Sequence, residues 1–456
     1  MDRLLARFAQ EVDTAVEIVT IYEKAGIQKE LVEEEYFLSL QSTHPSSAWF
    51  ERKIHDDFGL KIAKGYDNRP FWQHETMPLI TAMKKSFQET QIERVTSPQP
   101  YRYKTIKGEG VFQVSVGPIH AGIIEPGHFH FSQAGEQILH LDVRHGYKYR
   151  GIEKMCEGKS LDALFPLLSR VSGNESIAYQ IALYQLKEQA LKKEITPNLT
   201  HAILLELERL VHHCTDIGFI PNDAGFGAAL SMASLLAEES KRILFTLTQS
   251  RFGFESIGKD IALQNKKKEL QTYVDKMNSE IQWFEDWIMD IPSLWDRLDT
   301  TGILTTKQAL LYDTVGVVAR ASGLKLDRRD SSFYRHYGYA LQREKKGDVA
   351  ARFILRINEI KNSLKIIENM LNDVTEYQMV EEKAYHDGEY LSFVESSIGE
   401  LMMYLKLKEG VVERLFIRDP SFINWQALHL MMPRDIIADF PLINKSCDLS
   451  YAGADL

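Results

Sequence analysis

The chain has few cysteines and no excess of basic residues. Its 456 residues include three cysteines, Cys156, Cys214 and Cys447, and no two of them form a CxxC pair. This excludes a disulfide framework and any iron–sulfur cluster held by four cysteines of this chain. The formal net charge of −10 argues against nucleic acid as a partner, because binding to phosphates needs a surplus of Lys and Arg.

Two further absences concern membranes and nucleotides. The longest apolar run, Phe226–Ala237, ends at Glu238, short of the ~20 residues needed to cross a bilayer. No basic and apolar leader opens the chain. The glycine-rich G-x-G-x-x-G turn of dinucleotide-binding folds is also missing. We therefore expect a cytoplasmic protein without a membrane span of its own, and any NADH chemistry belongs to another polypeptide.

The composition is that of a folded protein. With 44% hydrophobic and 26% charged residues, the chain is long enough for more than one domain. Apolar residues at helical spacing (Leu4, Leu5, Phe8 and Val12) predict that residues 1–45 are mainly helical. Residues 70–105 have the turn residues of a connector. We therefore divide the chain into an N-terminal helical segment with its connector, 1–105, and a main domain, 106–456.

The main domain begins and ends with strand patterns and is helical between them. Alternating apolar and polar residues between glycine turns predict a β-hairpin or small sheet after Tyr101. A second set of strands follows residue 385, with turns at His386–Gly388 and Glu409–Gly410. Apolar residues at every third or fourth position predict the bundle helices between these sets: Ile177–Lys193, Thr200–Cys214, Gly227–Ser250, Lys266–Met289, Thr306–Gly316 and Val349–Val374.

Two motifs resemble parts of known families. The residues Trp49, Glu51, Arg52, Asp56, Phe58 and Gly59 resemble the signature that ends the 30-kDa subunit of complex I. Two sequence segments, GPIH…EPGHF (Gly117 to Phe129) and GYKYRGIEK (Gly146 to Lys154), form the second motif. They resemble the start of the large subunit of group 4 nickel–iron hydrogenases, such as formate hydrogenlyase, and of the related 49-kDa subunit of complex I. The helix that carries Asp348, Arg352, Arg356, Glu359 and Ser363 extends this resemblance, which runs from about Trp49 to Leu456.

The resemblance implies an α+β fold. We expect a hydrogenase large-subunit-like helical bundle with β-rich segments near both ends, preceded by a short remnant of the 30-kDa type. Within it, Asp216–Ala229 and Gly316–Asp330 look like loops between the bundle helices.

The residues that should hold a nickel–iron centre are different here. The family holds this centre with two CxxC motifs, an early one that reads RVCGIC and a late one that resembles DPCYSCTD. In this chain Ser172 and Glu175 stand at the early positions, and Ser450 and Gly453 stand at the late ones. Oxygen groups are poor substitutes for the soft thiolates that bind nickel. Cys447 lies three residues too early in this alignment, so we predict no metal site on this chain.

The vacated site supplies the candidate functional residues. By the resemblance, a cavity there is lined by Glu125, Arg170, Ser172, Glu175 and Ser450. Carboxylates buried beside one arginine have shifted pKa values and could relay protons. In the alternative interpretation, Arg170 and Glu175 form an ion pair that fills the space. Ser172, Ser450 and Gly453 are the former metal-ligand positions at which a cofactor would bind.

Two other parts of the sequence offer ligand sites. His128 and His130 share a strand face near Glu125 and could bind a metal, but a polar strand face is the more ordinary explanation. Complex I holds quinone in its emptied cavity through a histidine and a tyrosine. Gly173 stands at the tyrosine position here, and the histidine position falls in the insertion Glu125–Gly127, so that site does not carry over residue by residue.

The resemblance implies a place in a complex. We expect a non-hydrogenase, hydrogenase-like subunit of a membrane-associated oxidoreductase related to complex I. Such a subunit packs against a small subunit with a 4Fe–4S cluster, near antiporter-like membrane subunits, and takes part in electron transfer to quinone or another acceptor coupled to ion translocation. The alternatives are a redox-inactive structural or proton-coupling subunit and, against the ligand pattern, an active hydrogenase.

Overall fold

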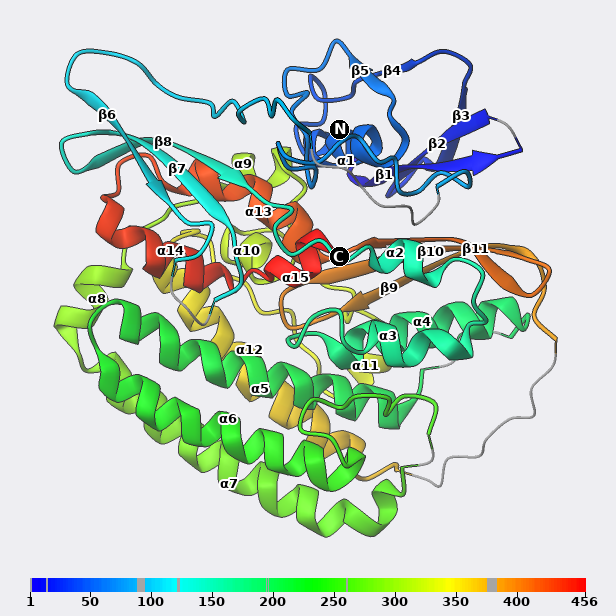
Figure 1. Ribbon diagram of the computed structural model, residues 1–456. Coiled ribbons are helices and arrows are strands. Elements are labelled where there is room, and N and C mark those ends of the chain that lie inside the picture. Colours follow the sequence, from blue (N-terminus) through cyan, green and yellow to red (C-terminus); the bar gives the residue numbers. More distant parts are fainter. Residues whose placement is uncertain are drawn as a thin grey trace.

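The chain folds into a helical bundle that is covered on one side by three small antiparallel sheets (Figure 1). The computed structural model describes residues 2–13, 15–87, 95–120, 124–193, 195, 197–259, 261–374 and 384–456. In Figure 1 the bundle lies at the bottom, and the N-terminal sheet lies at the top. The C-terminal residues end in the centre of the molecule, between the sheets and the bundle.

The N-terminal residues form strands, so the prediction of helix over residues 1–45 is wrong. Strands β1 (Leu4–Val12), β2 (Ala15–Tyr22) and β3 (Gly26–Val32) make an antiparallel sheet in the order β1-β2-β3. β1 is buried along most of its length, since Phe8 stacks on Phe416 while Ala9 packs in a separate cluster with Ile54. A strand buried on both faces loses its alternation, and its apolar run cannot then be told from a helix.

Helix α1 (Ser47–Phe58) follows and carries the residues of the complex I-like signature. It ends at Gly59, whose φ of 76° lies in the left-handed region that favours glycine. The parallel pair β4 (Tyr36–Leu38) and β5 (Lys61–Ala63) lies beside it. The described part of residues 70–105 contains no helix or strand, in agreement with the predicted connector.

The strands predicted after Tyr101 are present. β6 (Val111–Val116), β7 (His128–Ala134) and β8 (Gln137–Arg144) form an antiparallel sheet in chain order. A short helix, α2 (Ile152–Cys156), follows it, and α3 (Phe165–Leu168) leads into the bundle.

The bundle is built from five long helices: α4 (Ser176–Ala190), α5 (Leu199–Asp223), α6 (Gly227–Thr248), α7 (Leu263–Met289) and α12 (Val349–Met370). The prediction of a loop over Asp216–Ala229 is wrong in its first half, because α5 continues to Asp223. Burial of Ile217 and Ile220 holds the last turns of α5 in the core. The shorter helices between α7 and α12 are α8 (Pro292–Leu298), α9 (Thr306–Leu311), α10 (Gly316–Ala321) and α11 (Ser332–His336).

The shorter helices correct two further expectations. The helix predicted over Thr306–Gly316 ends at Leu311. The expected loop Gly316–Asp330 begins with α10.

A third antiparallel sheet and three helices follow at the C-terminal end of the described chain. β9 (Gly388–Glu395), β10 (Glu400–Lys408) and β11 (Val411–Arg418) are antiparallel. Glu409–Gly410 joins β10 to β11 as predicted, but residues 396–399 make the first turn instead of His386–Gly388. Helices α13 (Pro420–Met431), α14 (Phe440–Cys447) and α15 (Tyr451–Asp455) follow. Within the described ranges, no helix has both the length and the apolar character to cross a membrane.

A buried ion cluster joins the N-terminal unit to the main domain. Lys53 on α1 and Arg414 on β11 each lie 3.0 Å from one carboxylate oxygen of Glu153 on α2. The other oxygen of Glu153 accepts a hydrogen bond from the backbone N–H of Ile417. The carboxylate therefore compensates two buried cations from different parts of the chain.

Replacing this carboxylate should destabilise the protein. We expect Glu153→Gln to lower the free energy of unfolding by about 3–5 kcal/mol, because it leaves the buried Arg414 without its carboxylate partner, although Lys53 keeps Asp57. The measurement is denaturant-induced unfolding. The matched control is Glu35→Gln, which breaks an exposed pair with Lys61 and should cause little change. Equal effects of the two substitutions would contradict the role given to Glu153.

Candidate functional site

The two segments that the resemblance aligns with the metal-binding motifs meet in the folded chain. Ser172 lies in the turn before α4, and Ser450 precedes α15. Their hydroxyl oxygens are 3.1 Å apart, within hydrogen-bonding distance. The resemblance therefore identified two positions that are far apart in the sequence and in contact in the structure.

Ser450 holds the C-terminal helix in place. Its hydroxyl accepts a hydrogen bond from the backbone N–H of Gly453 and so caps the N-terminus of α15. Its carbonyl accepts a hydrogen bond from the indole N–H of Trp425 at 3.1 Å. Gly453 is tightly packed, since a Cβ atom there would lie 2.1 Å from the carboxylate of Asp419. No larger residue fits at 453 while Asp419 keeps its place.

Glu175 is fully buried, but it does not pair with an arginine. Its carboxyl group accepts a hydrogen bond from the hydroxyl of Ser396 and lies within hydrogen-bonding reach of Asp419. Burial, and after it the charge of Asp419, raises the pKa of Glu175 well above its ordinary value. Two buried carboxyl groups in contact favour a shared proton, with protonated Glu175 as the donor to Asp419.

The expected pairing of Arg170 with Glu175 is wrong. The Arg170 guanidinium points outward, lies 2.7 Å from Glu255 and covers the ring of Phe254. Nearly half of its side chain is exposed. The physical reason is that Arg170 ends a turn at the surface and Glu175 opens a helix that points into the core, so the two side chains diverge.

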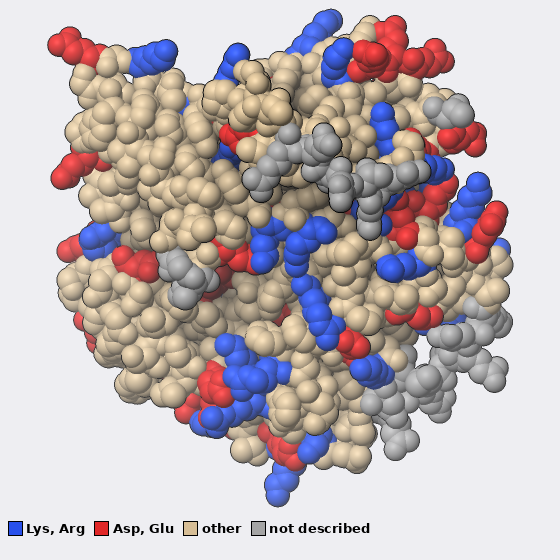
Figure 2. Space-filling model, in the orientation of Figure 1, with Lys and Arg blue, Asp and Glu red and all other residues tan. Residues whose placement is uncertain are grey.

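Glu125 lies at the edge of the site. One of its carboxylate oxygens accepts a hydrogen bond from the backbone N–H of Ala452 at 2.9 Å, and the other lies 3.3 Å from Lys148. Figure 2 shows Lys and Arg side chains down the middle of the face that Figure 1 views. Glu125 thus fixes the C-terminal helix from the solvent side instead of lining a closed cavity.

Sequence reasoning missed Asp419 and Tyr179 as site residues. Asp419 is fully buried and caps α13 by accepting a hydrogen bond from the N–H of Ser421. It also accepts one from the hydroxyl of Tyr179 at 2.7 Å. An Asp-Pro pair before a helix indicates an N-cap, but nothing in the sequence places that cap beside Glu175.

A third buried carboxyl group lies near Glu175. Glu208 on α5 accepts hydrogen bonds from the backbone N–H groups of Ile177 and Ala178, at 2.6 and 3.1 Å, where α4 begins. Burial raises its pKa to about 8. The start of α4 therefore lies beside two carboxyl groups, those of Glu175 and Glu208, that keep their protons near neutral pH.

Ser396 connects Glu175 to a buried network of charges. The carbonyl of Ser396 accepts a hydrogen bond from Arg209, which lies 3.8 Å from Glu359. Glu359 in turn contacts His213 and Arg320. The network runs between α5, α10 and α12, which places ionisable groups at short intervals through the bundle.

His128 and His130 are strand residues beside an aromatic ring. Tyr103 packs on both imidazoles, and His130 hydrogen-bonds Ser115. Across the described parts of the chain, no group of three or more His, Cys, Asp or Glu side chains is arranged to hold a metal ion.

The residues present do not fit a nickel–iron centre of the four-thiolate kind. The two serine hydroxyls contact each other, Glu175 is engaged with Ser396 and Asp419, and Asp419 fills the space beside Gly453. Cys447 lies buried at the end of α14, 3.6 Å from the sulfur of Met431. What this arrangement can do is hold and exchange protons.

Comparisons with known proteins agree with this architecture. A family model for the 49-kDa subunit of respiratory-chain NADH dehydrogenase matches residues 248–386 and 374–456. Formate hydrogenlyase subunit 5 of Escherichia coli (strain K12) is 28% identical over 432 residues, which are 90% of this chain and 75% of that protein. An NADH-quinone oxidoreductase subunit of Chloroherpeton thalassium is 27% identical over 366 residues, 70% of this chain and 82% of that one.

The fold is also found in a solved structure. A chain of the membrane-bound sulfane sulfur reductase, an archaeal respiratory membrane complex, superimposes with a TM-score of 0.71. The match has 21% identity and covers 76% of this chain and 99% of that one. At this identity the likeness is one of fold.

Vibrational spectroscopy tests the protonation of Glu175. Infrared spectra near neutral pH should contain a protonated-carboxyl band that Glu175→Gln removes, because burial and Asp419 keep the proton on this group. Glu125→Gln, the same change at the exposed edge of the site, should leave that band in place. An unchanged band in Glu175→Gln would contradict the shared proton.

Glu208 should make stability depend on pH. Its pKa is raised from 4.5 to about 8 in the folded state, so the folded chain binds one proton more than the unfolded chain between these values. The free energy of unfolding then falls as pH rises through this window, by up to about 1.4 kcal/mol per pH unit. We expect Glu208→Gln to flatten the decrease, as measured by denaturant unfolding at several pH values. An equally steep decrease in the variant would contradict the raised pKa.

Proposed function

Because the chain belongs to the family of complex I 49-kDa subunits and nickel–iron hydrogenase large subunits, we propose that it is a hydrogenase-like large subunit that works without a nickel–iron centre. It is a subunit of a membrane-associated oxidoreductase related to complex I, attached to the membrane through its partners. The observation that carries the proposal is the buried Glu175–Asp419 pair in the place of the metal ligands.

The partners follow from the family. A small subunit that carries a 4Fe–4S cluster packs near the Ser172–Ser450 contact, and antiporter-like membrane subunits lie beyond it. Electrons from the cluster pass to quinone or another acceptor near this site. The names of the relatives, a formate hydrogenlyase subunit and an NADH-quinone oxidoreductase subunit, support a redox complex of this general type.

The chain's own residues supply the proton chemistry. Glu175 holds a proton against Asp419, and the hydroxyls of Tyr179 and Ser396 stabilise the pair from two sides. A negative charge that develops beside the pair would draw this proton outward, and the Arg209–Glu359 network would respond to the change in charge. Electron transfer and protonation are coupled in this way, which is the basis proposed for ion translocation.

A redox-inactive, proton-coupling subunit is the second candidate. The same observations favour it, because the acid pair and the network of ion pairs need no electron carrier. The two candidates differ in the partner: the redox candidate requires a cluster in the small subunit within electron-transfer reach, and the inactive candidate does not.

Metal analysis and EPR of the complex separate these functions. The complex is purified with its partners under anaerobic conditions, and its nickel and iron are measured. We expect iron without nickel, together with the EPR signal of a reducible cluster. Stoichiometric nickel would contradict the proposal, because it requires ligands that this chain lacks. Absence of both metals would favour the redox-inactive subunit.

A further inference from the structure

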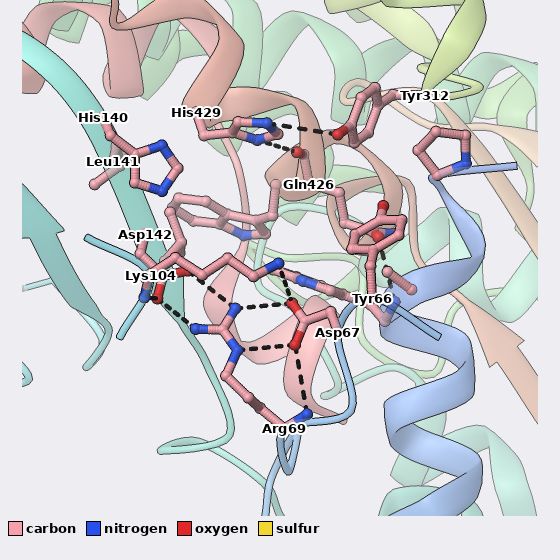
Figure 3. A pocket seen from close by; sticks show the side chains of 15 residues that line it. Tyr66, Asp67, Arg69, Lys104, His140, Leu141, Asp142, Tyr312, Gln426 and His429 are labelled. Carbon is pink, nitrogen blue, oxygen red and sulfur yellow. Dashed lines mark hydrogen bonds and ion pairs between the residues drawn. The ribbon is translucent and has the colours of Figure 1, made fainter. Parts of the chain in front are cut away.

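A polar pocket lies at the junction of the N-terminal unit and the main domain, away from the Glu175–Asp419 pair. Figure 3 shows its lining residues, which come from α1, the segment after β5, the connector, β8, the end of α9 and α13. Its volume is about 220 Å³, larger than the ~150 Å³ cavity that accommodates benzene. A molecule of about ten non-hydrogen atoms therefore fits.

The ion cluster at the floor of the pocket, counted with the buried Arg52 behind it, carries one surplus positive charge. Asp67 accepts hydrogen bonds from Arg69 and Lys104 and lies 3.7 Å from Arg52. Asp142 is bound by the same Arg69 guanidinium. Among the described residues, this cluster thus joins three cations to two carboxylates, and Arg52 lies behind the residues that line the pocket. These ion pairs hold the pKa of Asp67 well below its usual range. Asp67 is therefore ionised at neutral pH, and the net positive charge of the cluster persists there.

The upper side offers neutral polar groups. His140 has a buried Nε2 atom without a hydrogen-bond partner among the described residues. Nδ1 of His429 is 2.8 Å from the carbonyl of Gln426, so this nitrogen carries the hydrogen and donates it. Nε2 of His429 is left to accept from the hydroxyl of Tyr312, 3.5 Å away. Burial lowers the pKa of both histidines, which keeps the imidazoles uncharged.

We propose that this pocket binds a small, flat monocarboxylate. A single negative charge balances the floor, and the Lys104 ammonium still has N–H groups to donate to it. The imidazole of His140, in the tautomer with hydrogen on Nε2, donates to a carboxylate oxygen. The rings of Trp49 and Trp425 line the pocket and provide flat apolar surface for the rest of the ligand.

Other ligand classes match the pocket less well. A cation would meet the surplus positive charge, and both carboxylates are already bound by Arg69. A nucleotide exceeds the volume. The described residues include no metal-binding group here or elsewhere.

The ligand would touch the residue that supports the C-terminal helix. Trp425 lines the pocket with its ring and donates its indole N–H to the carbonyl of Ser450. His145 packs between Trp49 and Trp425, at ring-centroid distances of 5.2 and 4.6 Å. An occupant that orders Trp425 therefore also orders the segment that begins at Ser450.

Calorimetric titration of the full chain with benzoate tests the proposal. Benzoate should bind at a single site, at least about tenfold more tightly than its neutral isostere benzamide, because the carboxylate gains a charge-assisted hydrogen bond. The cation benzamidinium should not bind. Absence of saturable benzoate binding, or equal affinity for benzamide, would overturn the proposal.

Matched substitutions assign the binding to this pocket. Lys104→Met and His140→Phe should each weaken benzoate binding at least about tenfold, whereas Lys104→Arg, which keeps the charge, should retain most of it. Lys107→Met is the control, because it removes the same charge from an exposed residue three positions along the connector. Equal losses in Lys104→Met and Lys107→Met would place the binding elsewhere and overturn the assignment.

Hydrogen exchange tests the connection to Ser450. Saturation with benzoate should slow exchange of the backbone N–H groups that follow Ser450, and Lys104→Met should abolish this effect at the same ligand concentration. Binding with unchanged exchange in this segment would overturn the proposed link through Trp425.

Discussion

The docking of the last seven residues into the centre of the molecule is the constraint on which the site depends. The Asp455 carboxylate accepts hydrogen bonds from the backbone N–H groups of Gly146 and Lys148, and the carbonyl of Leu456 accepts one from the N–H of Arg150. These bonds fasten the C-terminal segment to the loop between β8 and α2. They bring Ser450 into contact with Ser172, although 278 residues separate the two in the sequence.

Once that segment is docked, the properties of the site follow from desolvation. At the four positions that the resemblance aligns with metal ligands, this chain has three oxygen-bearing side chains, one of them the buried Glu175, and one glycine. Water cannot reach the Glu175 carboxyl group and no cation pairs with it among the described residues, so the least costly state is one in which it shares a proton with Asp419. A site that holds protons thus lies where the resemblance places the metal-binding motifs.

At the junction between the N-terminal unit and the main domain, the buried carboxyl groups are ionised instead of protonated. There the charges remain ionised because cations and carboxylates from separate elements compensate one another, as Glu153 does for Lys53 and Arg414. The pocket at this junction has the same character but lacks one anion. Trp425 lines the pocket and hydrogen-bonds Ser450, so one side chain contacts both the junction and the C-terminal segment.

The sequence by itself determined the α+β fold class, the family resemblance and the main bundle helices, and it supplied the four positions that the resemblance aligns with metal ligands. These features depend on local periodicity and on motifs whose residues lie close together in the sequence. It could not determine the strands β1 and β2, because burial on both faces removes the alternation that identifies a strand. Only the tertiary structure decided that Arg170 turns to Glu255 and that Asp419 and Tyr179 face Glu175, since those contacts join residues up to 240 positions apart. Long-range packing sets the solvent exposure of each carboxyl group, and that exposure fixes its proton affinity.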